Sequence, residues 1–283
     1  MHTLRHHIKE AQSKGVAIGH FNISNLEGLH GVFDAARELN VPVLIGVSEG
    51  EREFFGVEEA STLVKELREK HDFPIFLNAD HTYSFDKVKE AIDAGFDSAI
   101  YDGAKGPIED NIRETKRCVE YARSTGREVL VEAELGFIGQ SSQIHDAVPE
   151  GVEVTSVADA IRFVTETGID LFAPAVGNIH GLLRDGPKPP LRPERVKEIA
   201  EATKIPLVLH GASGYSKEDV QACIKGGIAI VHVNTEIRVA YKEALEKSLE
   251  EKTDEVAPYK LLAPAVLAVK EVVLEKLREF NFL

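Results

Sequence analysis

The chain has 283 residues, of which 43% are hydrophobic and 28% charged, and this composition excludes a disordered, collagen-like or coiled-coil protein. Lys and Arg number 33 and Asp and Glu number 47, so the net charge is −14. Such a charge repels nucleic-acid phosphates and anionic lipids, so we expect no nucleic-acid partner and no membrane partner. An anionic small molecule would need local positive charge, most simply from a metal ion or from backbone N–H groups.

The two cysteines, Cys118 and Cys223, exclude a disulfide framework and a cysteine-based zinc site. The N-terminal segment lacks the apolar stretch of a signal peptide, and the apolar runs elsewhere are too short to span a bilayer. We therefore expect a cytoplasmic protein.

Eight short apolar runs predict strands, and an amphipathic stretch that predicts a helix follows each of them. The predicted strands cover residues 16–22, 41–47, 75–80, 98–103, 128–135, 171–177, 206–211 and 228–234. The predicted helices cover residues 26–39, 50–71, 84–95, 109–126, 157–168, 192–203, 216–225 and 236–251. One more helix is predicted at 261–280, and its broad apolar face fits either packing on the barrel or a subunit interface.

This order predicts an α/β protein, a single (β/α)8 TIM barrel domain over residues 1–283 with an extra C-terminal helix. Short strands that are apolar on both faces belong to parallel sheets, and eight right-handed crossovers in a chain of this length close a barrel. An open doubly wound sheet is the competing fold. It usually has a Gly-rich phosphate loop after its first strand, whereas the first strand here runs into the segment FNIS.

A barrel enzyme has its active site at the C-terminal ends of the strands, and several predicted strands end in polar residues. His81, His180 and His210 stand at or just after three of these ends, and Glu134 closes the fifth strand. A single histidine there would more often be a hydrogen-bonded rim residue. Three imidazoles with one carboxylate form a ligand set that suits zinc, and also cobalt, iron or manganese. The sequence therefore predicts a divalent metal site.

Asp80 directly precedes His81 and is a further polar residue at the end of the third strand. Adjacent residues of a strand point to opposite faces, so the third strand must end or bend here if both side chains act. Other polar residues that follow strand ends are further candidates for the site: Asn22, Ser48, Asp102 and Glu236.

A phosphate site is predicted after strands seven and eight, where barrels often build one. The segment Gly211-Ala212-Ser213-Gly214 follows the seventh strand, and Asn234-Thr235 follows the eighth. Small residues let backbone N–H groups approach an anion, and Ser213 and Thr235 add hydroxyl donors. Two long loops at the same end, 136–155 and 181–191, are candidate lids.

These strand ends resemble the class II fructose-bisphosphate aldolase family, which includes the tagatose-bisphosphate aldolases, over essentially the full length of the chain. The matching segments are GHFNISNLEG, VPVLIGVSEG, NADHTYSFDKVKEAIDAGFDS, YDGAKGPIEDNI, VEAELG, GIDLFAPAVGNIHG, IPLVLHGASG and VHVNTEIRVAY. The resemblance implies reversible cleavage of a ketose bisphosphate, most simply fructose 1,6-bisphosphate, to dihydroxyacetone phosphate and glyceraldehyde 3-phosphate. It also implies a homodimer or homotetramer.

The resemblance assigns roles to the candidate residues. His81, His180 and His210 would bind the divalent metal, typically zinc, with Glu134 as an exchangeable fourth ligand and Asp80 as the acid/base at the C4 hydroxyl. The metal would act as a Lewis acid, so no Schiff-base lysine is required. A monovalent cation, Na⁺ or K⁺, is implied near the phosphate. The residues implied to hold the dihydroxyacetone-phosphate half are Gly181, Arg184 (a lysine in the family), Gly211, Ser213, Asn234 and Thr235.

One loop departs from the family pattern. The family usually has a Gly-Gly followed by an acidic pair after the ELG motif, and one glutamate of that pair moves the carbon-bound proton of dihydroxyacetone phosphate. Residues 137–146 of this chain lack the acidic pair. His145, Asp146 and Glu150 are the candidates to replace it, with Asp146 or His145 favoured.

Three other functions stay open at the level of the sequence. A class II-like lyase would act on a different phosphorylated ketose, such as tagatose bisphosphate or a deoxy-sugar acid phosphate. A sugar-phosphate binding barrel would bind such a ligand without turnover, and a metal-dependent hydrolase would release phosphate. Release of triose phosphate that EDTA blocks would separate the two lyases from the other two classes.

Overall fold

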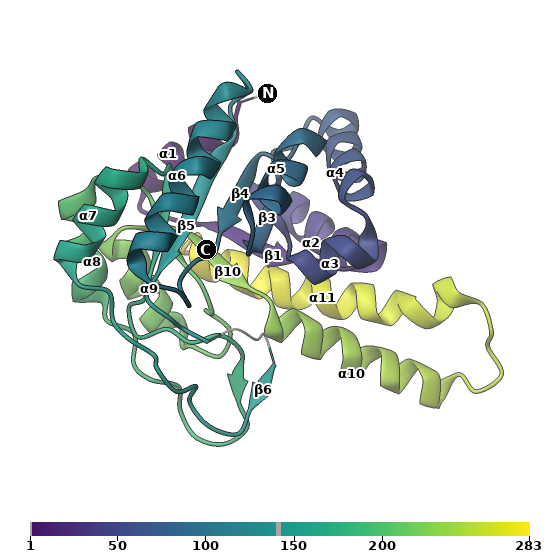
Figure 1. Ribbon diagram of the computed structural model, residues 1–283. Coiled ribbons are helices and arrows are strands. Elements are labelled where there is room, and N and C mark those ends of the chain that lie inside the picture. The colour runs from purple at the N-terminus through teal and green to yellow at the C-terminus, as the bar shows by residue number, and fades with distance from the viewer. Residues whose placement is uncertain (1, 140–142) are drawn as a thin grey trace.

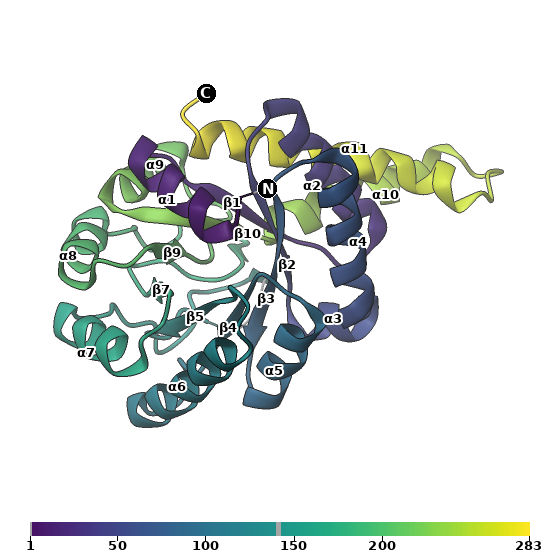
Figure 2. The ribbon, with the colours of Figure 1, turned by 90° about the horizontal axis from the view of Figure 1, so that it is seen from above.

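The structure is a computed structural model that describes residues 2–139 and 143–283. Eight parallel strands form a closed barrel in the order β1-β10-β9-β7-β5-β4-β3-β2, with helices around its outside (Figure 2). The barrel strands are β1 (Ile18–Asn22), β2 (Val43–Val47), β3 (Ile75–Thr82), β4 (Ser98–Tyr101), β5 (Leu130–Leu135), β7 (Leu171–Pro174), β9 (Leu207–Leu209) and β10 (Ile228–Val233). The predicted (β/α)8 barrel is confirmed.

The helices follow the predicted rhythm with two differences. They are α1 (Leu4–Lys14), α2 (Leu26–Leu39), α3 (Glu49–Phe55), α4 (Val57–His71), α5 (Phe85–Ala94), α6 (Ile108–Ser124), α7 (Val157–Thr167), α8 (Pro193–Thr203), α9 (Lys217–Gly226), α10 (Thr235–Glu251) and α11 (Pro258–Phe280). Helix α1 was not predicted. The helix predicted at 50–71 is two helices, because Gly56 adopts a φ of +94° and interrupts it.

The interior of the barrel changes from apolar to polar along the strands. Phe76 of β3 and Leu130 of β5 belong to an apolar cluster that α1 covers with Leu4 and Ile8. Because side chains two residues apart on a strand share a face, the positions above Phe76 and Leu130 also point into the barrel. Those positions carry Asn78 and Asp80 on β3 and Glu132 and Glu134 on β5, so polar groups gather at the C-terminal mouth.

Helices α10 and α11 form an arm that projects from the barrel (Figures 1 and 2). Near the barrel α11 packs closely, since a Cβ atom on Gly31 of α2 would lie 2.7 Å from Val269 Cγ1. The arm also exposes large apolar side chains, among them Leu249, Val256, Tyr259 and Leu267. The predicted C-terminal helix therefore packs on the barrel over one part of its length and extends beyond it over the other.

Two long loops at the mouth are joined by a small parallel sheet that was not predicted. Strand β6 (Ile144–His145) belongs to the loop after β5, and β8 (Leu182–Leu183) belongs to the loop after β7. Gln140, Ser141 and Ser142 of the loop that departs from the family pattern lie outside the described residues. Over the described ranges, none of the helices is long and apolar enough to cross a membrane.

Candidate active site

The four predicted metal ligands meet at the C-terminal mouth of the barrel. His81 lies near the end of β3, Glu134 on β5, His180 in the loop after β7 and His210 directly after β9. Their ligand atoms all lie within 4.8 Å of one another. Three of the four residues are buried, and His81 is partly exposed. The fold thus brings together four side chains that come from four separate strand ends.

Two carboxylates hold the rings of His81 and His210 from outside this group. His81 Nδ1 lies 2.9 Å from Asp102 Oδ2, and His210 Nε2 lies 2.7 Å from Glu132 Oε1. The other two ring nitrogens, His81 Nε2 and His210 Nδ1, face each other at 3.2 Å. Carboxylates commonly hold the second nitrogen of a metal-binding imidazole and fix its orientation. Asp102 and Glu132 are placed to do this.

The charges of the group fit a divalent cation. Burial, together with the charge of Asp102, raises the pKa of Glu134 well above its ordinary value. Burial, together with His81 and His210, lowers the pKa of His180 well below its ordinary value. Glu134 Oε2 is buried without a hydrogen-bond partner among the described residues. A cation would supply the missing partner and stabilise neutral imidazoles beside ionised carboxylates, so these residues fit a metal ion.

Strand β3 bends where Asp80 and His81 follow each other. His81 has a φ of +32°, and the register of β3 against β4 shifts between Ala79 and Thr82. The buried guanidinium of Arg52 supports the bend, because it donates to the Asp80 carbonyl at 3.2 Å and to Thr82 Oγ1 at 2.9 Å. The predicted bend is present, and Arg52, which sequence analysis did not single out, holds it.

The Asp80 carboxylate is buried at the mouth among polar groups. Its Oδ2 accepts a hydrogen bond from Asn22 Nδ2 at 2.8 Å, and its Oδ1 lies 3.4 Å from His232 Nδ1. Burial opposes ionisation, but the neighbouring histidines, first His81, hold the pKa of Asp80 well below its ordinary range. The Asp80 carboxylate is therefore held in its ionised form.

Asn22 and Ser48 belong to a chain of hydrogen bonds behind Asp80. Asn22 Nδ2 also donates to Glu51 Oε2 at 2.9 Å, and Ser48 donates its backbone N–H to the same oxygen at 2.8 Å. Arg238 donates to Glu51 Oε1 at 2.5 Å. Asn22 thus contacts Asp80 directly, whereas Ser48 is linked to Asp80 only through Glu51 and Asn22.

All of the residues predicted to hold the dihydroxyacetone-phosphate half except Arg184 line the same cavity as Asp80 and the three histidines. They are Gly181, Gly211, Ser213, Asn234 and Thr235. Two of the positions require glycine. Gly211 has a φ of +63°, and a Cβ atom there would lie 2.4 Å from Ile179 O. Gly181 has a φ of +77°, and its Cβ atom would lie 2.2 Å from Gln143 O.

Arg184, Asp146 and Glu236 lie elsewhere. Arg184 Nε donates to Asp146 Oδ1 at 2.7 Å, and both side chains are exposed at the outer edge of the small sheet. Glu236 Oε1 accepts from the backbone N–H of Gly214 at 2.5 Å, and its other oxygen pairs with Lys276 at 3.0 Å. In this arrangement Arg184 is paired with Asp146, and Glu236 holds the loop after β9.

His145 takes a different position from its neighbour Asp146. A Cβ atom on Gly181 would lie 2.6 Å from His145 Nε2, so the imidazole lies against the backbone next to His180. The small sheet fixes this arrangement, because the Arg184 N–H donates to His145 O at 2.8 Å. His145 thus lies against Gly181, which lines the cavity, whereas Asp146 pairs with Arg184.

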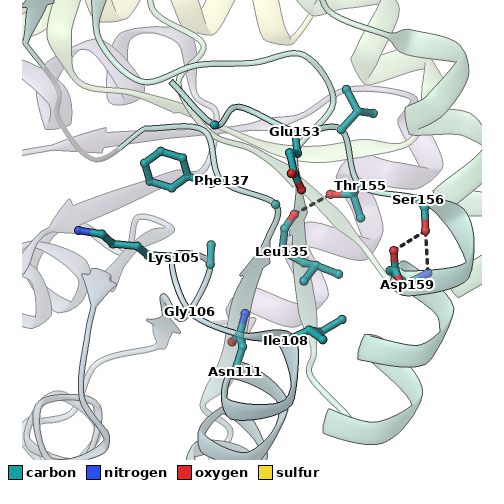
Figure 3. Close-up of a pocket in the computed structure, with 14 residues that line it drawn as sticks. Lys105, Gly106, Ile108, Asn111, Leu135, Phe137, Glu153, Thr155, Ser156 and Asp159 are labelled. Carbon is teal, nitrogen blue, oxygen red and sulfur yellow. Dashed lines mark hydrogen bonds between the residues drawn. The ribbon is translucent and has the colours of Figure 1, made fainter. Parts of the chain in front are cut away.

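A second cavity lies next to this site. It has about 510 Å³ and lies between the loop after β4 and the segments around Leu135 and Thr155 (Figure 3). Asn111, at its floor, donates to the Glu134 carbonyl at 2.9 Å. None of the predicted site residues lines this cavity. The hydrogen bond from Asn111 to the backbone of β5 connects the cavity to the site.

A closed (β/α)8 barrel with three histidines and a glutamate at its C-terminal mouth defines a class, the barrel enzymes with a candidate metal centre. A sequence model of the family described as fructose-bisphosphate aldolase class-II matches residues 2–282. The chain belongs to this family, whose members are metal-dependent carbon–carbon lyases. The resemblance seen in the strand-end segments is thereby confirmed.

Individual relatives agree with the family match. Proteins named fructose-bisphosphate aldolase from Staphylococcus epidermidis and Staphylococcus aureus are each 40% identical over 277 residues, which cover 96% of this chain and 94% of the relative. The crystal structure of the YdjI aldolase from Escherichia coli K12 is similar with a TM-score of 0.83 at 34% identity. That match covers 98% of this chain and 96% of the other.

Proposed function

We propose that this aldolase cleaves fructose 1,6-bisphosphate reversibly to dihydroxyacetone phosphate and glyceraldehyde 3-phosphate, with zinc as its metal. One observation carries the proposal. His81 and His210 turn one ring nitrogen each toward a common point, and Asp102 and Glu132 hold the nitrogens on their other sides. Three imidazoles and Glu134 around that point are a ligand set that zinc favours.

The proposed ligands are His81, His180 and His210, with Glu134 as the fourth and exchangeable one. When bound, the divalent ion supplies Lewis-acid polarisation of the substrate ketone. The partial pairing of Glu134 suits an exchangeable role, because its Oε2 has no hydrogen-bond partner within the described residues. The three imidazoles are held more firmly, two of them by carboxylates.

Asp80 is the proposed acid/base of carbon–carbon cleavage. Its ionised carboxylate accepts the proton of the C4 hydroxyl as the C3–C4 bond breaks, and C4 becomes the carbonyl carbon of the aldehyde product. The bonding electron pair stays with the three-carbon ketone half. In the reverse direction Asp80 returns the proton to the C4 oxygen. Asn22 fixes the carboxylate for both steps through its hydrogen bond to Oδ2.

The three-carbon half must then gain a proton at C3, and we propose that His145 supplies it. His145 lies against Gly181, which lines the cavity, whereas Asp146 pairs with Arg184 on the exposed side. Imidazole is the side chain that most often serves as a general acid or base in enzymes. The proposed phosphate-binding residues are Gly181, Gly211, Ser213, Asn234 and Thr235, while Arg184 needs to leave Asp146 to take part.

The proposal also includes the predicted oligomeric state and cellular location. The α10–α11 arm exposes Leu249 at 51% and Leu267 at 61%, and a second copy of the chain would cover such side chains in a homodimer or homotetramer. The substrate of the proposed reaction is a small sugar phosphate. A cytoplasmic location is kept as a prediction.

A coupled assay with fructose and tagatose bisphosphates, each with EDTA and then with restored zinc, tests the function. We expect triose phosphate from fructose 1,6-bisphosphate that EDTA abolishes and zinc restores. Faster turnover of tagatose bisphosphate would assign the other ketose instead. Release of inorganic phosphate would indicate a hydrolase, and tight binding without turnover of either ketose would indicate a sugar-phosphate binding protein.

A further inference from the structure

One partly buried lysine has an unusual set of partners. Lys188, in the loop between β8 and α8, directs its Nζ at four backbone carbonyl oxygens. The distances are 2.7 Å to Ile179 O, 3.0 Å to Gly181 O, 2.9 Å to Gly211 O and 2.8 Å to Ser213 O. Ile179 and Gly181 flank His180, and Gly211 and Ser213 follow His210, so the four carbonyls belong to the two loops that carry these histidines.

The surroundings of Lys188 suit a cation held by dipoles. Its Nζ also lies 4.4 Å from the centre of the Tyr215 ring, which adds a cation–π contact. Burial lowers the pKa of Lys188 to about 7, although the negative charge of Glu236 raises it. Hydrogen-bond acceptors around the ammonium group favour its protonated form. Four carbonyl oxygens around one monovalent charge are also the kind of ligands that an alkali-metal ion takes.

The peptide groups whose carbonyls contact Lys188 also have their N–H groups hydrogen-bonded. The N–H that shares a peptide with Ile179 O belongs to His180 and donates to Ile138 O at 3.0 Å. The corresponding N–H of Ala212 donates to His232 O at 3.2 Å, and that of Gly214 donates to Glu236 Oε1 at 2.5 Å. Each peptide plane is therefore fixed between Lys188 and a second partner.

We propose that Lys188 is a built-in monovalent cation that positions the loops after β7 and β9 for phosphate binding, in the place where a Na⁺ or K⁺ ion could otherwise bind. Lys188 does not line the cavity, so it acts through the backbone of Gly181, Gly211 and Ser213. Its charge also adds positive potential on the side where an anion must enter a chain of net charge −14. The monovalent cation that the resemblance implies is, on this proposal, part of the chain.

A pair of substitutions tests the proposal. Lys188→Ala opens space inside the carbonyl cage, so a small cation can enter, whereas Lys188→Met fills the space without a charge. In choline chloride we expect both variants to keep their zinc and to raise KM for the bisphosphate by about 10-fold or more, the range for losing hydrogen bonds to a charged group. Potassium or ammonium chloride should lower KM again in a saturable way for Lys188→Ala only.

The controls separate this role from general stabilisation. Lys242→Ala, an exposed lysine on α10, should leave KM unchanged in every salt. Wild type should have the same KM in choline, sodium and potassium chloride. A wild type that needs sodium or potassium, or a Lys188→Ala variant with normal KM in choline chloride, would overturn the proposal.

The kinetic readout rests on the proposed aldolase activity, so a second measurement does not depend on it. The melting temperature of Lys188→Ala should rise with potassium or ammonium but not with choline, and that of Lys188→Met should respond to none of them. Equal shifts in melting temperature for the two variants would contradict the proposal that the four carbonyls form a cation-binding cage. If Lys188→Ala does not fold, the measurement on wild type tests the proposal. A saturable rise of the wild-type melting temperature with potassium would show that Lys188 does not fill the cage.

Discussion

Asp80 and His81 are consecutive residues of β3, yet both side chains lie at the mouth of the barrel, with Asp80 Oδ1 3.9 Å from His81 Nε2. A regular strand would send them to opposite faces. The φ of +32° at His81 turns the chain, and Arg52 holds the turned segment through the Asp80 carbonyl and the Thr82 hydroxyl. One strand end can therefore supply a proposed acid/base and a proposed metal ligand side by side.

Asp80→Asn is expected to separate proton transfer from binding. The amide keeps the shape of the carboxylate and its contact with Asn22 but cannot accept the C4 hydroxyl proton. We expect kcat to fall by about 10²–10⁴-fold, the usual contribution of a general acid/base, with zinc content unchanged. Single-turnover cleavage and metal analysis of the same sample measure both quantities. A turnover number near that of wild type would remove Asp80 from this role.

Removal of the metal ligands is expected to abolish both zinc binding and cleavage. His81→Ala, His180→Ala and His210→Ala should each lose most of the bound zinc and essentially all activity, because each removes one of three imidazoles. Glu134→Gln should be milder. Zinc should also raise the melting temperature of wild type by mass action but not that of the three variants.

The matched control is His30→Ala, which changes an exposed histidine on α2. It should keep zinc, activity and melting temperature. Full zinc occupancy in His180→Ala would show that the metal binds elsewhere.

The fold was predictable because each strand and each helix carries its own periodic pattern. The meeting of the four proposed ligands was predictable because a barrel collects its strand ends at one mouth. Helix α1 was missed because it precedes the first strand and stands outside that repeat. The small sheet of β6 and β8 was missed because Ile144–His145 and Leu182–Leu183 are only two residues each. Such short segments pair only because two distant loops meet in space.

Two residues near the site needed the three-dimensional structure. Glu132 stands two residues before Glu134, so their shared face was readable, but its contact with His210 depends on where the end of β9 lies. Lys188 stands in a loop rich in Gly and Pro and looks like an exposed lysine in the sequence. Its role depends on four carbonyl orientations, and backbone carbonyls have no signal in the residue letters.

Glu132→Gln is expected to weaken zinc binding although Glu132 is not a proposed ligand. The carboxylate holds His210 Nε2 at 2.7 Å, and an amide oxygen there is a weaker acceptor for the same N–H. Loss of such a partner typically lowers metal affinity by about 10–100-fold. Competition with a fluorescent chelator measures the affinity, and Asp102→Asn should behave in the same way through His81. If zinc affinity in Glu132→Gln equals that of wild type, the contact has no part in orienting His210.

The arm is expected to mediate self-association. Leu249→Glu combined with Leu267→Glu places charges on exposed apolar positions of α10 and α11, so it should disrupt a subunit contact without disturbing the barrel core. Light scattering after gel filtration should give a smaller mass for the double variant than for wild type. Lys242→Ala on the same arm should not change the mass. Equal masses for wild type and the double variant would place the subunit contact, if any, elsewhere.

The loop proton transfer can be assigned by isotope exchange at dihydroxyacetone phosphate. An aldolase that handles the C3 proton exchanges it with solvent deuterium even without the aldehyde partner, and NMR follows this exchange directly. We expect wild type to exchange and His145→Ala to lose exchange with its zinc intact, because His145 is the loop residue that lies beside Gly181. Asp146→Ala should keep exchange, since its carboxylate pairs with Arg184 on the exposed side. The reverse result would assign the proton to Asp146 and require the loop to leave its pairing with Arg184 during turnover. Exchange that survives the triple change of His145, Asp146 and Glu150 to Ala would place the base outside this loop.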